Sequence, residues 1–199
     1  MSDSKPEQQI GEVRLQYEGE GGRLAVVTLA NPTKLNAISR HMWQQLRSVF
    51  NSISGNKNAG CVLICGENCG DLKAFSAGGD ISEYPSFRFN EASLREFHEV
   101  DVWGGLHAML ACDVPIVAQI EGSCMGAGLE MASCCDIRIA GTSAKFGAPI
   151  AKLGFPMAPK EAEVVVRAVG KLTAREMLME AAVLDAPTML QRGFLNRVV

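Results

Sequence analysis

The chain has 199 residues, enough for one domain with a complete hydrophobic core. Its formal net charge of −3 at pH 7 provides neither the basic surface that nucleic acids bind nor a polybasic stretch for an anionic membrane. The longest apolar runs have the length of strands and are too short to span a bilayer. We therefore expect no nucleic-acid partner and no membrane partner.

Residues 1–11 are polar and lack the apolar core of a signal peptide, so we expect a disordered tail followed by one folded unit, residues 12–199. Seven cysteines, an odd number in a chain without an export signal, favour reduced thiols and a cytoplasmic location. No two cysteines have the spacing of a zinc knuckle, and the three histidines lie apart from them in sequence. No metal site is predicted.

The first third of the chain contains three candidate strands and one helix. Residues 13–17 alternate weakly and residues 23–30 form an apolar strand, with a glycine-rich hairpin turn between them at 19–22. Ser39 is expected to cap a helix that runs to about Ile53, because its apolar residues recur with a helical period. A short apolar strand at 61–65 follows.

The remaining chain alternates between strands and helices. Strands are predicted at 115–120, from 136, and up to Phe146. Small residues at 122–128 indicate a turn, and a Gly/Pro-punctuated turn is expected at 149–159. Helices are predicted at 91–112, after 126, at 159–169, at 173–180 and at 187–192. This alternation is typical of an α/β fold with right-handed crossovers.

Two glycine-rich turns, 77–80 and 126–128, each follow an apolar segment. Each can donate one backbone N–H to the same carbonyl oxygen, and two such donors form an oxyanion hole. Alternatively, the glycines of either turn alone serve only to let the backbone pack closely. Glu130 follows the second turn at the start of an apolar helix. It is either an acid–base group beside an anion site or a structural carboxylate.

Several motifs occur in order along the chain: Leu35–Ala37, Ala74–Ile81, Val114–Gly122, Gly126–Glu130, Cys135–Ala140, Ala144–Gly147 and Gly193–Val199. Together they closely resemble the crotonase (enoyl-CoA hydratase/isomerase) superfamily. The resemblance implies a crotonase-like ββα superhelix with two roughly perpendicular sheets flanked by helices. It also implies an acyl-CoA substrate, with coenzyme A present as part of the thioester and no separate cofactor.

The resemblance also assigns roles to particular residues. The N–H groups of Gly79 and Ala127 would bind the thioester oxygen, and Glu130 would be catalytic. The first turn and the segment before Leu35 contact coenzyme A in the family. The substrate-binding candidates are therefore Lys34, Ala37, Ser76, Ala77, Asp80 and Ile81.

The sequence departs from the family at the second catalytic glutamate. That residue should follow Pro149, but the position holds Ile150, which can line the pocket and cannot transfer a proton. Other titratable side chains are alternatives, although each is interpreted as a solvent-facing charge on an amphipathic helix. These are Glu83, Glu96, His98, Glu99, Asp101, Glu161 and Glu163.

The resemblance points first to a lyase of fatty acid metabolism that adds or removes water through an enolate. An isomerase, decarboxylase or thioester hydrolase with one catalytic glutamate is an alternative, and a non-catalytic acyl-CoA-binding protein is another. Family members assemble as homotrimers or hexamers in their full-length form, through a C-terminal helical layer that we expect to be absent here. The acyl chain and the stereochemistry are not defined by the sequence.

Overall fold

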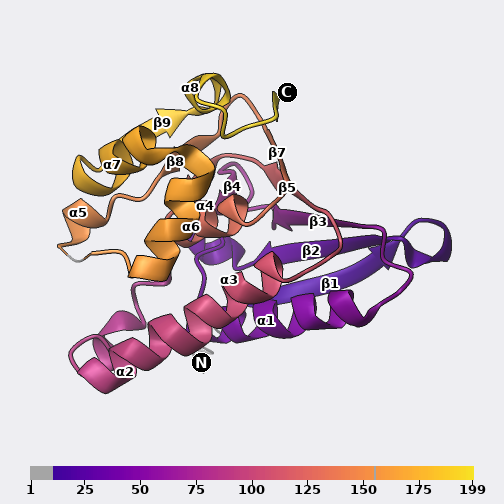
Figure 1. The fold of residues 1–199 in the computed structure, drawn as a ribbon, viewed down its shortest axis with the longest axis horizontal. Coiled ribbons are helices and arrows are strands. Elements are labelled where there is room, and N and C mark those ends of the chain that lie inside the picture. Colours follow the sequence, from indigo (N-terminus) through magenta and orange to yellow (C-terminus); the bar gives the residue numbers. More distant parts are fainter. Residues whose placement is uncertain (1–10, 155) are drawn as a thin grey trace, which may run out of the picture.

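The structure, a computed structural model that describes residues 11–154 and 156–199, contains two sheets flanked by helices (Figure 1). The predicted tail lies outside the described residues except for Gly11. Gly11 is buried, and a Cβ placed on it would lie 2.8 Å from Met42 Sδ. Among the described residues, no helix combines the length and the apolar composition needed to cross a membrane.

The larger sheet has six strands in the order β1-β2-β3-β5-β7-β10. Strands β1 and β2 form the predicted antiparallel hairpin, and the other neighbours pair in parallel. Alternate residues of β2 (Ala25, Val27 and Leu29) are fully buried, as expected for a strand with one face on the core. The bounds are β1 Glu12–Glu18, β2 Leu24–Ala30, β3 Cys61–Gly66, β5 Ile116–Ile120, β7 Ile137–Ala140 and β10 Arg197–Val198.

The smaller sheet has four strands in the order β4-β6-β8-β9, of which only β9 is antiparallel to its neighbour. The bounds are β4 Ala74–Ser76, β6 Ser123–Met125, β8 Lys145–Gly147 and β9 Val183–Asp185. The sequence predicted a turn where β6 lies and did not predict β9. A strand of three residues is too short to show an alternating pattern. Whether such a segment forms a strand depends on the neighbouring strands with which it pairs.

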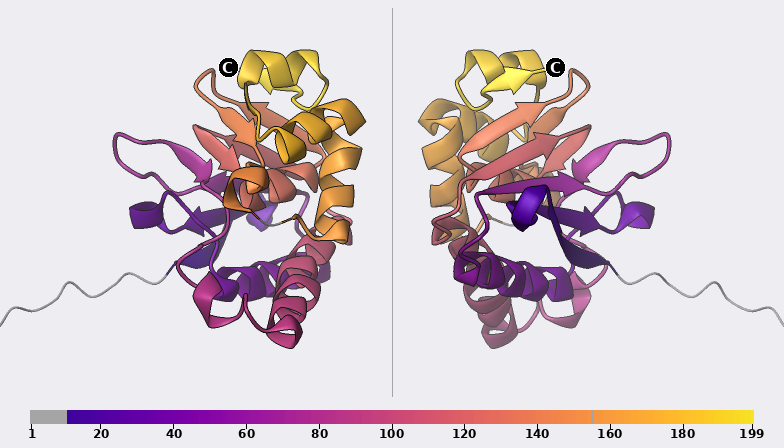
Figure 2. Two further views of the ribbon diagram at one scale, coloured as in Figure 1. Left: turned by 90° about the vertical axis from the view of Figure 1, so that its left-hand side faces the viewer. Right: turned by 90° about the vertical axis from the view of Figure 1, so that its right-hand side faces the viewer.

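The chain passes three times through the same unit: a strand of the larger sheet, a strand of the smaller sheet, then helix. The units begin with β3 and β4, β5 and β6, and β7 and β8. This confirms the ββα superhelix. Figure 2 shows that the last helices lie at the opposite end of the molecule from α1 and α2. The helices are α1 Arg40–Gly55, α2 Glu91–Glu96, α3 Trp103–Leu110, α4 Ala127–Ser133, α5 Ile150–Leu153, α6 Pro159–Val169, α7 Lys171–Met179 and α8 Ala186–Gln191.

Helix α1 forms as predicted. The Ser39 Oγ accepts a hydrogen bond from Met42 N at 3.2 Å, which caps the first turn. Its buried residues recur every three or four positions and face α3 and β1. The predicted turn at 149–159 was only partly right, because it contains the single helical turn α5.

The predicted helix at 91–112 is interrupted by a π-helical segment, Phe97–Val102, between α2 and α3. Hydrogen bonds from residue i to i+5 bring side chains five positions apart onto the same face. Phe97 and Val102 accordingly line one cavity together with His98. Hydrophobic periodicity alone does not reveal a π-helical segment, since the same residues also fit an α-helical pattern.

Candidate active site

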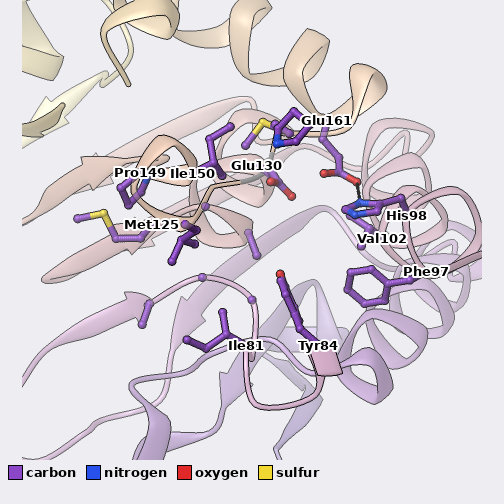
Figure 3. Close-up of a pocket in the computed structure, with 18 of the residues that line it drawn as sticks. Ile81, Tyr84, Phe97, His98, Val102, Met125, Glu130, Pro149, Ile150 and Glu161 are labelled. Carbon is purple, nitrogen blue, oxygen red and sulfur yellow. Dashed lines mark hydrogen bonds and ion pairs between the residues drawn. The ribbon is translucent and has the colours of Figure 1, made fainter. Parts of the chain in front are cut away.

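A cavity of about 120 Å³ lies where the two glycine-rich turns meet the helices (Figure 3). One wall is the backbone of the turns at 77–79 and 125–127. Glu130 of α4 and Glu161 of α6 face the cavity, and the π-helical segment supplies Phe97 and His98. Two carboxyl groups and two backbone turns therefore converge on one mostly apolar space.

The two glycine-rich turns touch each other. A Cβ placed on Gly126 would lie only 3.8 Å from Gly78 Cα. Gly126 has φ 47° and ψ −111°, a conformation that side chains disfavour, and it directly precedes α4. Gly128 lets α4 approach β4, because a Cβ there would lie 3.0 Å from Ser76 O. These glycines hold Ala127 at the cavity.

Gly79 and Ala127 line this cavity from the two turns, as the sequence predicted. Neighbouring amides are engaged: Gly78 N donates to Ser76 Oγ and Asp80 N to Ile38 O. Within residues 11–154 and 156–199, neither the Gly79 N–H nor the Ala127 N–H donates a hydrogen bond to another group. Two backbone donors at one cavity wall fit the requirement for binding a carbonyl oxygen.

Glu130 lies one turn into α4, where its own N–H bonds to Gly126 O at 2.9 Å. Burial and, next, the negative charge of Glu161 raise the pKa of the Glu130 carboxyl well above its usual range. Such a shift favours the protonated form of the carboxyl. The carboxyl can therefore donate that proton as a general acid.

Glu161 is 4% exposed and also faces the cavity. Its Oε1 lies 2.8 Å from His98 Nδ1, the contact marked by the dashed line in Figure 3. The interpretation of Glu161 as a solvent-facing charge is therefore wrong. A signal was present in the sequence, since Glu161 falls on the same face of α6 as the buried Val164, Val165 and Val169.

The Tyr84 ring rises from the floor of the cavity toward the carboxyl groups (Figure 3). Burial, followed by the charges of Glu130 and Glu161, raises the pKa of Tyr84 to about 12. The hydroxyl therefore stays protonated at neutral pH. Its oxygen would lie only 2.6 Å from a Cβ placed on Gly79, so Tyr84 packs closely against the first turn.

Ile150 opens α5 and lines the cavity beside Pro149 and Met125 (Figure 3). This wall carries no titratable group. The side opposite, formed by His98 and Glu161, carries the second carboxylate instead.

The predicted site residues separate into two groups. Gly79, Ala127, Glu130, Ala77, Ile81 and Ile150 line the cavity. Lys34, Ala37, Ser76 and Asp80 do not. Ala37 and Ser76 are buried beneath the turns, and Ile81 is 59% exposed at the rim.

Lys34 and Asp80 bind each other. Lys34 Nζ donates to Asp80 Oδ2 at 2.6 Å and to Ser82 Oγ at 3.0 Å. Burial opposes ionisation of Asp80, but the hydrogen bonds from Lys34 and Ser82 prevail and lower its pKa. This pair stabilises the loop after the first turn.

The other alternative carboxylates lie outside the cavity. Glu99 and Glu163 form surface ion pairs with Arg95 and Arg167. Glu96 and Asp101 pair with Arg40, and Glu83 accepts a hydrogen bond from the Arg40 N–H. Asp101 is buried, so its interpretation as a solvent-facing charge is also wrong. No cluster of metal-ligating side chains occurs among the described residues, and the seven cysteines are free thiols.

Comparison with known proteins agrees with the geometry of the site. Residues 19–199 match the sequence profile of the enoyl-CoA hydratase/isomerase family. The chain is 32% identical over 177 residues to a Mycobacterium leprae protein named "Probable enoyl-CoA hydratase echA8", covering 89% of this chain and 65% of the relative. It is 30% identical over 193 residues to the short-chain-enoyl-CoA hydratase of Clostridium acetobutylicum, covering 96% of this chain and 70% of the relative.

A solved structure is also similar throughout. The crystal structure of an enoyl-CoA hydratase/carnithine racemase from Magnetospirillum magneticum superposes with a TM-score of 0.87 at 36% identity, covering 94% of this chain and 67% of that one. The chain thus spans 65% of the length of the mycobacterial relative and 67% of this structure.

Proposed function

Because this chain belongs to the enoyl-CoA hydratase/isomerase family, we propose that it binds acyl-CoA thioesters and catalyses addition and elimination of water beside the thioester. The observation that carries this proposal is the convergence of the Gly79 and Ala127 N–H groups and the buried Glu130 carboxyl on one cavity. Coenzyme A enters as part of the substrate.

The two N–H groups act on the thioester oxygen. When water oxygen adds to the β-carbon of an enoyl thioester, the π-electron pair moves toward that oxygen and an enolate forms. Preorganised N–H donors stabilise the developing charge, and removal of one such donor typically costs about 2.7–4 kcal/mol. Gly79 and Ala127 are the donors in this proposal.

Glu130 moves a proton. Its raised pKa favours the protonated carboxyl, which can deliver a proton to the α-carbon as the enolate collapses. In the reverse direction the carboxylate removes that proton. Ala77 and Ile81 at the cavity rim are proposed to contact the pantetheine arm, together with the predicted coenzyme A segment that contains Lys34, Ala37, Ser76 and Asp80.

Hydration of crotonyl-CoA tests the function directly. We expect loss of the enoyl absorbance when protein is added, with 3-hydroxybutyryl-CoA as the product by NMR. A saturated acyl-CoA should raise the melting temperature, because a ligand that binds only the folded state stabilises it. Absence of both turnover and thermal stabilisation would contradict the proposal.

The contact between Gly79 and Tyr84 gives a second prediction. In Gly79→Ala, the new Cβ meets Tyr84 Oη at 2.6 Å, so the turn or the ring must shift. We expect kcat/KM to fall on the order of 10²-fold, since small displacements of positioning groups have effects of this size. Adding Tyr84→Phe should recover most of the loss, because the next atom, Cζ, is 3.5 Å away. A double variant no better than Gly79→Ala would contradict the steric explanation.

Assembly as a homotrimer or hexamer and a cytoplasmic location also belong to this proposal. Exposed apolar side chains on the neighbouring helices α5 and α7 support assembly: Leu153, Leu172 and Met179. Seven free thiols support a reducing compartment, because cysteines of exported proteins are usually oxidised to disulfides.

A further inference from the structure

Building on the proposed function, we propose that Glu161 is the second proton-transfer group of this site and that His98 positions it. Glu161 would thereby replace the carboxylate that the family pattern places where this chain has Ile150.

Packing does not explain why a carboxylate lies at this position. Val164, Val165 and Val169 provide the buried face of α6, and Glu161 interrupts that apolar face at the end nearest the cavity. Burying an ionised group has a free-energy cost of several kcal/mol unless it is paired. A buried Glu161 facing Glu130 is therefore best explained by its chemistry.

His98 holds one oxygen of this carboxylate. With its proton on Nδ1, His98 donates to Glu161 Oε1 across 2.8 Å. The His98 ring is itself packed edge-on against Phe97, with 5.2 Å between ring centroids. Glu161 Oε2 has no hydrogen-bond partner within the described part of the chain, so it remains available to accept a proton from water.

The two carboxyl groups have different surroundings, and this difference assigns their roles. Burial and then the charge of Glu161 raise the pKa of Glu130, which favours its protonated form. Glu161 has the His98 ring nitrogen within hydrogen-bond distance of one oxygen, and it borders a second cavity as well. Tyr84, with a pKa of about 12, stays protonated and cannot serve as the base.

In the forward reaction, Glu161 takes a proton from water while the water oxygen bonds to the β-carbon. The π-electron pair moves to the thioester oxygen, and the enolate then takes the Glu130 proton at the α-carbon. The product contains one added water, Glu161 is left protonated and Glu130 ionised. A proton must then return from Glu161 to Glu130.

The proton returns across the catalytic cavity, which both carboxyl groups line, and the second cavity borders only Glu161 of the two. His98 and Glu161 border both the catalytic cavity and a neighbouring one of about 340 Å³, which also contacts Glu91, Arg95 and Lys160. Water in the outer cavity can exchange protons with the His98–Glu161 pair. Glu130 is recharged from the protonated pair across the catalytic cavity.

Substitution of Glu161 tests the proposal. Glu161→Gln keeps the shape and removes the base, so kcat for crotonyl-CoA hydration should fall roughly 10²–10⁴-fold, the usual contribution of general acid–base catalysis. The Kd of a saturated acyl-CoA, measured by calorimetry, should stay within a few-fold. Glu163→Gln is the matched control, since Glu163 lies on the same helix in a surface pair with Arg167 and should leave kcat unchanged.

Two His98 variants test its positioning role. His98→Phe keeps the ring and removes the donor, so kcat should fall roughly tenfold or more with little change in KM. His98→Asn places an amide N–H near the position of Nδ1 and should recover much of that loss. Equal activity of the two variants would show that His98 does not act through the hydrogen bond.

The outcomes separate this proposal from the function on which it rests. If Glu161→Gln stays within about threefold of wild type in kcat while Glu130→Gln is inactive, Glu161 is not the second group and the proposed function stands. If wild type neither hydrates enoyl-CoA thioesters nor exchanges the α-hydrogens of a saturated acyl-CoA with deuterated solvent, both proposals fail. Loss of kcat with retained acyl-CoA binding in Glu161→Gln supports both.

Discussion

Glu130→Gln is expected to lower enoyl-CoA hydration by roughly 10²–10⁴-fold and to increase the stability of the fold at neutral pH. The amide fills the same space but cannot deliver a proton to the α-carbon. Acyl-CoA binding should persist, since the Gly79 and Ala127 N–H groups are unchanged. Steady-state kinetics with crotonyl-CoA and calorimetry with a saturated acyl-CoA measure the two effects separately.

The expected gain in stability follows from the raised pKa of Glu130. Burial and then the Glu161 charge make the ionised form less favourable in the folded state than in the unfolded chain. At this group the folded state therefore binds more protons, so the contribution of Glu130 to the free energy of unfolding is highest below the ordinary glutamate pKa of about 4.3. It falls as pH rises from there toward the raised pKa of the folded state.

Chemical unfolding between pH 4 and pH 8 measures this dependence. Each unit of difference between the folded-state and unfolded-state pKa of Glu130 changes the free energy of unfolding by about 1.4 kcal/mol. Glu130→Gln should remove this contribution from the slope of the free energy of unfolding against pH. Glu161, Tyr84 and His98 line the same cavity and are present in both proteins. The exposed Glu163→Gln should retain the wild-type slope. A Glu130→Gln variant less stable than wild type by the same amount at pH 5 and pH 8 would refute the assignment.

Gly122→Ala is expected to destabilise the fold by more than about 4 kcal/mol or to prevent folding. Gly122 connects β5 of the larger sheet to β6 of the smaller sheet. Its φ is 61°, and an added Cβ would lie 1.8 Å from the Lys73 backbone oxygen. Backbone cannot move aside as a flexible side chain can. The paired strands β4 and β6 would have to separate, and the turn that carries Ala127 would move with them.

Gly70→Ala is the matched control for this prediction. Gly70 also has a positive φ, 73°, but no atom lies within 4 Å of an added Cβ. Its substitution should therefore cost only the conformational term, about 1–2 kcal/mol. Urea unfolding of both variants compares the two. Equal losses of stability would show that the contact with Lys73 is not close.

Long patterns in the sequence predicted most of the fold. The apolar strands at 23–30, 61–65 and 115–120 and the capped helix from Ser39 carry enough residues to reveal their period. The three-residue strands β6 and β9 do not, because so short a segment has no measurable alternation. The π-helical turn at Phe97–Val102 was also missed, since hydrophobic spacing does not distinguish it from an α-helix.

The sequence by itself determined the family, the two glycine-rich turns and the position of Glu130, because these belong to motifs of consecutive residues. Only the tertiary structure decided which charge faces Glu130. Glu161 and His98 are 63 residues apart. The helical period of α6 places Glu161 on the buried face, but no local pattern shows which residue lies against it. Packing of α6 beside the π-helical segment buries Glu161 and brings His98 Nδ1 to 2.8 Å from Glu161 Oε1. Local periodicity cannot predict such a pair, because it depends on how two distant helices meet.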